Sequence, residues 1–236
     1  MNENKKIKIT IGIPTASDML HRKFVQSLHC LQYPINTEID INIVSGHQLP
    51  FARNRIVQHA LKTNADYLFF IDADMIFPSD ILIRLLKHDL DIVNALAFRR
   101  TKPHYPCIFN WNEIEKSYET VSYSTGLLSV DATGMPAILI KTDVFRKMKE
   151  IYPQNPWYYY RDNLFSSDLT FCENARKLRY KIMIDTDLKI GHIGEEIVVT
   201  EDFYLSHLSL EEKEKHNQRI RDFLKVDEKK NDPTIK

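Results

Sequence analysis

The segment Tyr67-Leu68-Phe69-Phe70-Ile71 is a run of five apolar residues that lacks the polar–apolar alternation of a half-buried strand. Its length is that of a strand, and continuous apolarity is typical of a strand covered on both faces, as in a parallel sheet between helices. The run therefore predicts an α/β fold with a mostly parallel sheet.

Strand-like and helix-like segments alternate through the first hundred residues, as repeated strand–helix–strand units require. Strands are predicted at 6–13, 38–44, 67–71 and 91–98, and helices at 18–31, 51–61 and 81–87. Further on, the pattern predicts a strand over 137–140, helices over 143–149 and 168–178, and a last strand or strand pair over 182–190. Residues 99–125 are irregular and aromatic, and fit loops or a small antiparallel excursion.

The composition is that of an ordinary globular protein, with 236 residues, 43% of them hydrophobic and 27% charged. Lysine plus arginine equals aspartate plus glutamate, at 32 each, so the chain has no net field to hold a polyanion, which argues against nucleic acid as a partner. No uncharged apolar run approaches the ~18 residues of a membrane span. Three scattered cysteines and the absence of a hydrophobic signal core fit a cytoplasmic protein.

The C-terminal segment is more highly charged than the rest of the chain. Ser209, with Glu212 three residues later, has the pattern of a capping box at a helix start. We therefore expect a single domain over 1–205, followed over 206–236 by a charged helix and a frayed tail.

The sequence contains three Asp-x-Asp pairs, a motif too short to carry information without its context. The pair Asp89/Asp91 lies in a polar turn between a predicted helix and a strand, and is expected to be solvated. The pair Asp185/Asp187 interrupts a strand pattern, which indicates a turn.

The third pair, Asp72/Asp74, directly follows the apolar run, so it lies at the carboxyl end of a predicted central strand. Open α/β sheets bind their ligands at that edge. Two like charges so close together need a cation, and carboxylate oxygens favour Mg²⁺ or Mn²⁺, whose remaining positions are usually taken by phosphate oxygens. The alternative is that the pair only ends the strand in a turn, which aspartate favours.

In this setting the segment 69–74 resembles the Asp-x-Asp segment of GT-A-fold, nucleotide-sugar-dependent glycosyltransferases of the family 2 type. Five further segments resemble motifs of that family and occur in its order: Ile11–Thr15, Phe51–Arg55, Asp131–Ala137, Ser167–Cys172 and Lys189–Gly194. The resemblance implies a GT-A-like (Rossmann-like) sheet flanked by helices, and a hexosyltransferase-like activity.

The resemblance also implies a donor site for a UDP- or GDP-linked sugar, with Mn²⁺ or Mg²⁺ as cofactor. It places Asp74 on the metal directly and Asp72 on the ribose and the metal's water shell. Arg53, near a helix start that favours anions, would contact the diphosphate or the base, or else pair with a nearby carboxylate. The implied nucleotide-sugar residues are Pro14, Thr15, Ala16, Arg53, Asn54, Asp72, Ala73 and Asp74.

His192 stands between Gly191 and Gly194, which predicts a flexible backbone from which the imidazole can swing onto a metal. The resemblance implies that it completes the metal site with Asp72 and Asp74, and imidazole suits Mn²⁺ better than Mg²⁺. With 9 histidines in the chain, the alternative is that it is a bystander.

Asp168 begins a predicted helix, where a carboxylate can cap the end or interact with the helix dipole. The resemblance implies that it is instead the general base that deprotonates an acceptor hydroxyl, as inverting members require. The family usually has Glu-Asp at this position, and this chain has Ser167-Asp168. That departure leaves the identity of the base open, and with it the choice between inversion and retention.

The acceptor-side loop implied by the resemblance assigns acceptor contacts to Gly134 and Met135. Trp157 opens an aromatic run, 157–161, and aromatic faces stack on sugar rings, so this run is either an acceptor platform or a loop packed on the sheet. The acceptor itself would be a glycan, a protein or a lipid-linked molecule.

Three other functions compete with an inverting, metal-dependent glycosyltransferase. A haloacid-dehalogenase-type phosphatase also ends a strand in Asp-x-Asp, but it normally has Thr or Val where this chain has Ile76. A nucleotidyltransferase would need a glycine-rich, arginine-bearing loop, which 11–19 lacks. The third alternative is a non-catalytic protein that binds nucleotide sugars or glycans.

Overall fold

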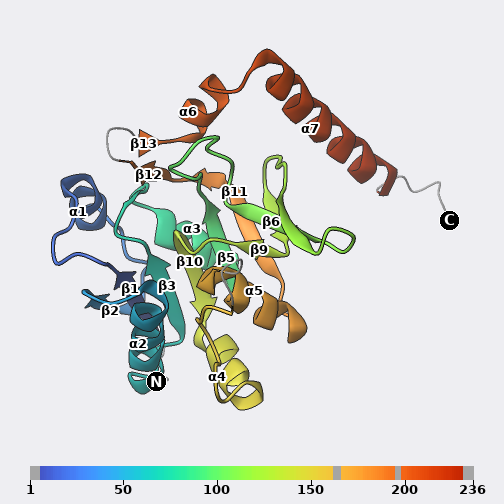
Figure 1. Cartoon of the computed structure of the whole chain (residues 1–236). Coiled ribbons are helices and arrows are strands. Elements are labelled where there is room, and N and C mark those ends of the chain that lie inside the picture. Colours follow the sequence, from blue (N-terminus) through green and yellow to red (C-terminus); the bar gives the residue numbers. More distant parts are fainter. Residues whose placement is uncertain (1–5, 162–165, 195–197, 231–236) are drawn as a thin grey trace.

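A seven-stranded sheet forms the centre of the computed structural model, which describes residues 6–161, 166–194 and 198–230 (Figure 1). The order of its strands is β2-β1-β3-β10-β5-β11-β8. Their bounds are Ile7–Pro14 (β1), Thr37–Val44 (β2), Tyr67–Ile71 (β3), Ile92–Leu96 (β5), Leu127–Val130 (β8), Ala137–Lys141 (β10) and Ile182–Lys189 (β11).

Most of these strands are parallel. β2, β1 and β3 run in one direction and so do β5 and β11, whereas β10 is antiparallel to both of its neighbours, β3 and β5, and β8 is antiparallel to β11. The predicted α/β class with a mostly parallel sheet is confirmed. Because β10 runs against its neighbours, its amino end lies beside the carboxyl end of β3, where Asp72 N donates to the carbonyl of Pro136 at 3.0 Å.

Helices cover both faces of the sheet. Their bounds are Arg22–His29 (α1), Leu49–Lys62 (α2), Ile81–Lys87 (α3), Thr142–Ile151 (α4) and Ser167–Lys177 (α5). α1 starts four residues later than the sequence predicts, because the His21 ring caps it by accepting from Lys23 N at 3.2 Å.

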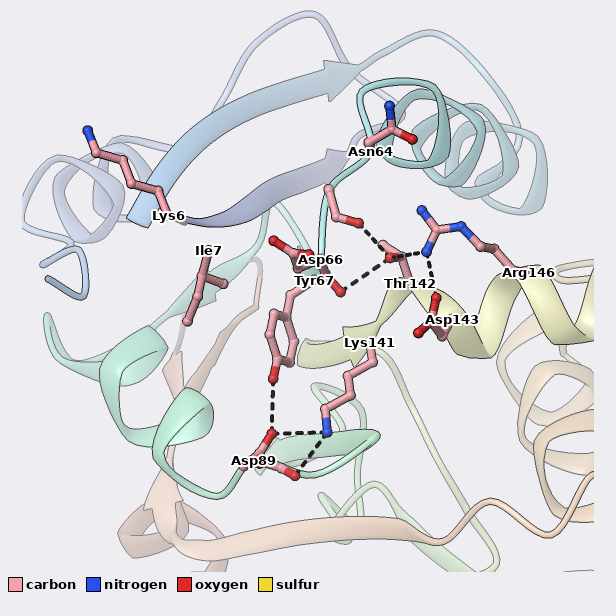
Figure 2. A pocket seen from close by; sticks show the side chains of 11 residues that line it. Lys6, Ile7, Asn64, Asp66, Tyr67, Asp89, Lys141, Thr142, Asp143 and Arg146 are labelled. Atoms are coloured by element: carbon pink, nitrogen blue, oxygen red, sulfur yellow. Dashed lines mark hydrogen bonds and ion pairs between the residues drawn. The ribbon is translucent and has the colours of Figure 1, made fainter. Parts of the chain in front are cut away.

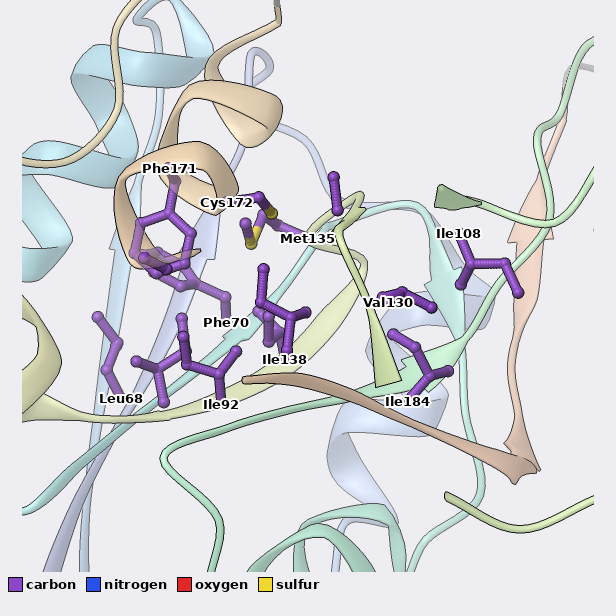
Figure 3. Packing of buried hydrophobic residues seen from close by; sticks show 14 of the residues in the cluster. Leu68, Phe70, Ile92, Ile108, Val130, Met135, Ile138, Phe171, Cys172 and Ile184 are labelled. Carbon is purple, nitrogen blue, oxygen red and sulfur yellow. The ribbon is translucent and has the colours of Figure 1, made fainter. Parts of the chain in front are cut away.

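The segment 67–71 has no polar face because each face of β3 packs into a different hydrophobic cluster. Leu68 and Phe70 pack in the cluster under α2, α4 and α5 (Figure 3), and Phe69 and Ile71 pack in the cluster under α1 and α3. All four side chains are fully buried, as the sequence predicts for a strand covered on both sides.

Gly12 allows α2 to pack directly on β1. A Cβ at this position would lie 2.4 Å from Ile56 Cγ2, and 3.2 Å from atoms of Leu68 and Phe70. Any larger residue would therefore push the helix away from the sheet, and with it the loop that follows β1.

Two small antiparallel sheets complete the fold. One consists of β6 (Ile108–Asn112), β7 (Ser117–Thr120) and β9 (Ala132–Thr133), and its first two strands lie within 99–125, where the sequence fits loops or an antiparallel excursion. The other joins β4 (Met75–Ile76), β12 (Gly191–Ile193) and β13 (Val198–Val199).

The C-terminal segment contains α6 (Glu201–Ser206) and α7 (Leu210–Lys230). The capping box is confirmed, since Glu212 N donates to Ser209 Oγ at 3.2 Å and Ser209 N donates to the Glu212 carboxylate at 2.8 Å. The tail that is predicted to fray, 231–236, lies outside the described residues. Within the described ranges, no helix is both long and apolar enough to cross a membrane.

The two Asp-x-Asp pairs away from the predicted site have structural surroundings. Asp89 and Asp91 are exposed and lie 3.0 and 3.6 Å from Lys141 Nζ. The turn predicted at Asp185/Asp187 is wrong, because β11 continues through a bulge there. Asp185 is buried, and its Oδ1 accepts from the backbone N–H of Asp187 and Leu188, each at 3.0 Å.

Candidate active site

The carboxyl ends of four parallel strands bring distant parts of the chain to one edge of the sheet (Figure 1). Pro14 ends β1 and Thr15 and Ala16 follow it, while Asp72–Asp74 follows β3, Arg100 follows β5 and His192 follows β11. Ligands of open α/β sheets bind at this edge.

A cavity of about 460 Å³ opens at this edge, within the usual ~300–1,000 Å³ of ligand pockets. Among the residues that line it are six that the sequence predicts to bind a nucleotide sugar: Pro14, Thr15, Ala16, Asp72, Ala73 and Asp74. Residues that sequence reasoning did not assign also line it, and they are Ser17, Met19, His21, His47, Leu49, Ala52 and Arg100.

The backbone turns directly after β3, which puts the two carboxylates of the motif in different surroundings. Met75 N donates to the Asp72 carbonyl at 3.2 Å, and Ile193 N donates to the Asp74 carbonyl at 2.7 Å. The turn thus leads into β4, and β4 pairs with β12 so that His192 lies opposite Met75.

The imidazole of His192 is held between two acceptors. Nδ1 lies 2.9 Å from the Phe98 carbonyl and Nε2 lies 3.1 Å from Asp74 Oδ2. A carbonyl can only accept, so Nδ1 carries a proton, and the Nε2 lone pair of the neutral ring points at a carboxylate. That arrangement is favourable only if Nε2 is protonated or if a cation lies between the two groups.

The electrostatics of this pair agree with its geometry. Burial lowers the pKa of His192, but the hydrogen bond and charge of Asp74 raise it more, so that the pKa lies above its ordinary value. Burial raises the pKa of Asp74, but the hydrogen bond and charge of His192 and the charge of Arg100 lower it by more, so the pKa lies below its ordinary value. The expectation of a flexible loop at His192 is wrong, because the residue lies in β12 with both ring nitrogens engaged.

Arg100 is a site residue that sequence reasoning missed. Its Nη1 lies 3.3 Å from Asp74 Oδ2, and its side chain is 58% exposed at the cavity. The signal that could have found it is its position just after β5, a strand whose carboxyl end shares the edge with β3.

Arg53 joins two of the predicted site residues. Its Nη2 donates to both carboxylate oxygens of Asp72, at 2.9 and 3.2 Å, and its Nη1 donates to Asp168 Oδ1. The guanidinium is fully buried and lies 5.7 Å from the centre of the Tyr158 ring. A direct diphosphate contact, predicted for Arg53, would need this buried group to leave both carboxylates, so the alternative of pairing with carboxylates describes its position.

Burial and charge oppose each other in this cluster of Arg53, Asp72 and Asp168. Burial raises the pKa of Asp72 to about 6, although the charge of Arg53 offsets part of the rise. Burial lowers the pKa of Arg53, but the charges of Asp168 and Asp72 hold it above its ordinary value. With both carboxylates ionised, the cluster has one more negative than positive charge.

Asp168 lies in the first turn of α5 and does not cap it. The cap is Ser166, whose hydroxyl accepts from Leu169 N at 3.4 Å. The hydrogen bonds to the Asp168 side chain from described residues, those of Arg53 and Ser167, both end on Oδ1. The second oxygen of this partly exposed carboxylate is therefore left for another donor.

The predicted acceptor residues lie deeper than expected. Trp157 is 3% exposed, and its indole N–H donates to the Phe145 carbonyl at 2.9 Å, so for Trp157 the platform prediction is wrong and the packing alternative is right. The Met135 side chain is also buried, and the Gly134 carbonyl accepts from the Asn94 side chain at 2.9 Å.

Asn54 is fully engaged within the protein. Its amide group donates to the Tyr158 carbonyl at 2.7 Å and accepts from Tyr158 N at 3.1 Å. It thereby fixes the segment that carries the ring over Arg53, and its predicted contact with a nucleotide sugar would break these bonds.

A larger cavity, of about 590 Å³, lies at the opposite edge of the sheet, beside the amino ends of β1 and β3 (Figure 2). Its charged groups neutralise one another, with Lys141 3.0 Å from Asp89 and Arg146 2.7 Å from Asp143. It offers no unpaired charge among these groups, and it lies away from the edge at which the predicted residues meet.

Comparisons with known proteins support the fold. No family model matches the chain, and no curated protein matches it. The chain is similar to A197 from STIV, with a TM-score of 0.59 at 16% identity over 82% of this chain and 90% of that chain.

Two structures of S. aureus TarS 1-349 also match. TarS alone has a TM-score of 0.46 at 13% identity, over 76% of this chain and 58% of TarS. The complex with UDP-GlcNAc has a TM-score of 0.49 at 14% identity, over 92% of this chain and 71% of TarS. These two superpositions are too loose to carry an argument, whereas the likeness to A197 shows a shared α/β fold.

Proposed function

We propose that this protein is a metal-dependent glycosyltransferase that moves a sugar from a nucleotide diphosphate sugar to an acceptor hydroxyl. The observation that carries the proposal is the cavity at the carboxyl edge of the sheet, where the loop after β1 and the pair Asp72/Asp74 meet. The order of six glycosyltransferase-like segments in the sequence supports the same activity.

Asp74 and His192 fit a divalent cation, because a carboxylate oxygen and an imidazole lone pair converge across 3.1 Å. Among the described residues no group of three or more Asp, Glu, His or Cys gathers at one point, so the remaining positions would fall to diphosphate oxygens and water. The chemistry that the cation supplies when bound is neutralisation of the charge that develops on the diphosphate leaving group.

The carboxylates that Arg53 holds would act on the acceptor. Arg53 fixes Asp72 and Asp168 by one rigid guanidinium, so both carboxylates keep their positions when substrates exchange. Asp168 would take the proton of the acceptor hydroxyl as that oxygen forms a bond to the anomeric carbon and the bond to the diphosphate breaks. Attack from the face opposite the leaving group gives inversion.

The direct test is hydrolysis of nucleotide sugars by the purified protein. We expect slow release of UDP or GDP from a panel of UDP- and GDP-sugars in the presence of Mn²⁺, and its loss with EDTA. Protein that binds no nucleotide sugar with either Mn²⁺ or Mg²⁺ would contradict the proposal. Phosphate release from small phosphomonoesters would instead favour the phosphatase alternative.

Asp74→Ala should abolish the Mn²⁺-dependent part of UDP or GDP affinity and leave the fold intact, since Asp74 supplies the carboxylate oxygen of the site. His192→Ala should weaken affinity with Mn²⁺ present and change it little in EDTA. Calorimetric titration measures both effects. Asp187→Ala, an exposed member of another Asp-x-Asp pair, is the matched control, and equal behaviour of the two aspartate variants would refute the metal site.

Arg100→Ala should weaken binding of UDP or GDP by about 10- to 100-fold. The reason is the loss of a hydrogen bond from Arg100 to the charged diphosphate, since such a bond contributes ~1.5–3 kcal/mol. The affinity for the corresponding nucleoside, which lacks phosphates, should stay the same. Arg99→Ala is the matched control, since the Arg99 guanidinium lies over the Phe109 ring at 5.3 Å. Equal losses for nucleoside and nucleotide would show that Arg100 only shapes the loop.

A further inference from the structure

A separate cavity of about 380 Å³ is lined by residues of the β6–β7 hairpin and of α5, together with Arg161. One wall is aromatic, formed by Trp111 on β6 and Tyr118 on β7. The two residues are paired across the strands, and their rings meet edge to face at 5.1 Å and 69°. Together they form a corner of two aromatic surfaces.

The other wall consists of charged side chains from α5 and of Arg161, which precedes that helix. Glu173 forms ion pairs with Arg161 and with Lys177, the latter at 2.9 Å. These groups border the cavity and present both hydrogen-bond donors and acceptors to it.

Asp131 fixes the two walls to each other. Its Oδ1 accepts from Arg176 Nε at 3.0 Å, and its Oδ2 accepts from Trp111 N at 2.8 Å. The hairpin and α5 are therefore tied together by one carboxylate, and the cavity between them is preorganised.

The pairing of the charged groups argues against an anion as the natural occupant. Each of the three cations that line it is already paired with a carboxylate, Arg161 and Lys177 with Glu173, and Arg176 with Asp131, so none of them is left to bind a phosphate. What remains is an aromatic corner beside many polar groups. A neutral ligand with an apolar face and a rim of hydroxyl groups fits that combination.

We propose that this cavity binds a neutral oligosaccharide, with a sugar ring packed on Trp111 and Tyr118 and its hydroxyl groups bonded to the ion pairs around Glu173. The proposal deepens the proposed function, on which it rests, by naming a glycan as the acceptor. Asp168 and Glu173 lie five residues apart on α5, about 8 Å along the helix axis. The two residues also differ by about 140° around that axis, so a glycan in this cavity would be anchored on the helix that carries the base, without occupying the donor cavity.

The experiment is a glycan array probed with the full-length protein, followed by calorimetry with the oligosaccharides that bind. Trp111→Ala should weaken binding by about tenfold, the loss expected for one aromatic contact and its buried area. Trp111→Phe keeps an aromatic face and should retain most of the affinity. Tyr33→Ala removes an exposed aromatic side chain outside the cavity lining, and should bind as wild type.

Nucleotide affinity and melting temperature, measured on the same samples, report whether each variant is folded. Wild-type protein that binds no oligosaccharide on the array, or Trp111→Ala that binds as tightly as wild type, would overturn the inference. So would capture of a peptide at Trp111 in place of a glycan. Glycan binding without any nucleotide binding would instead refute the proposed function and leave the cavity assigned.

Discussion

Replacing Arg53 with methionine should lower the free energy of unfolding by about 3 to 5 kcal/mol, the cost of removing one partner from a buried ion pair. Arg53 is fully buried and donates to both Asp72 and Asp168. Without it, two carboxylates would face each other at a partly buried position with no cation between them. Urea unfolding of the variant and of wild type measures the difference.

Three further variants separate this mechanism from a simple loss of packing. Arg53→Lys should recover only part of the stability, because an ammonium cannot donate to two carboxylates in the fork geometry of a guanidinium. Combining Arg53→Met with Asp72→Asn and Asp168→Asn should recover more, since the uncompensated charge is then gone. Arg55→Met, an exposed position on the same helix, is the matched control. A triple variant as unstable as Arg53→Met alone would contradict the charge argument.

The fold was largely predictable because its main signal is local. The run 67–71 is apolar on both faces, and the strands and helices around it have lengths and periods that can be counted along the chain. The direction of β10 was not predictable, since a five-residue apolar strand has the same pattern whichever way it runs. The bulge at Asp185 was also hidden, because it depends on a side chain that bonds its own backbone in place of the ladder.

The site was predictable where it depends on the ends of strands, and less so where it depends on tertiary contacts. Asp72 and Asp74 follow the most apolar strand, so their place at the carboxyl edge follows from the sequence. Arg100 could be found only once β5 was known to share that edge. The sequence also gives no measure of burial for an aromatic run, which is why Trp157 was assigned to an acceptor platform and Trp111 was not.

Asp168→Asn should reduce the rate of sugar transfer by about 10²- to 10⁴-fold, the usual contribution of a general base. An amide of the same size can still accept from Arg53 and Ser167 through its oxygen, but it cannot take a proton. Donor affinity should stay close to wild type, because the residues that line the donor cavity are unchanged. Transfer rates at saturating donor, together with calorimetric donor titrations, measure both quantities.

The same substitution removes the negative charge of Asp168, which pairs with the buried Arg53. A fall in stability is therefore expected beside the fall in rate, and the two effects must be separated. Ile140→Val, in the buried part of β10, supplies a variant that is destabilised by ~0.5–1.5 kcal/mol away from the site. If lost stability were the cause, Ile140→Val would also transfer slowly per folded molecule. Transfer near the wild-type rate by folded Asp168→Asn would reject this residue as the base. It would favour a retaining mechanism, in which no side chain opposite the leaving group has to take the acceptor proton.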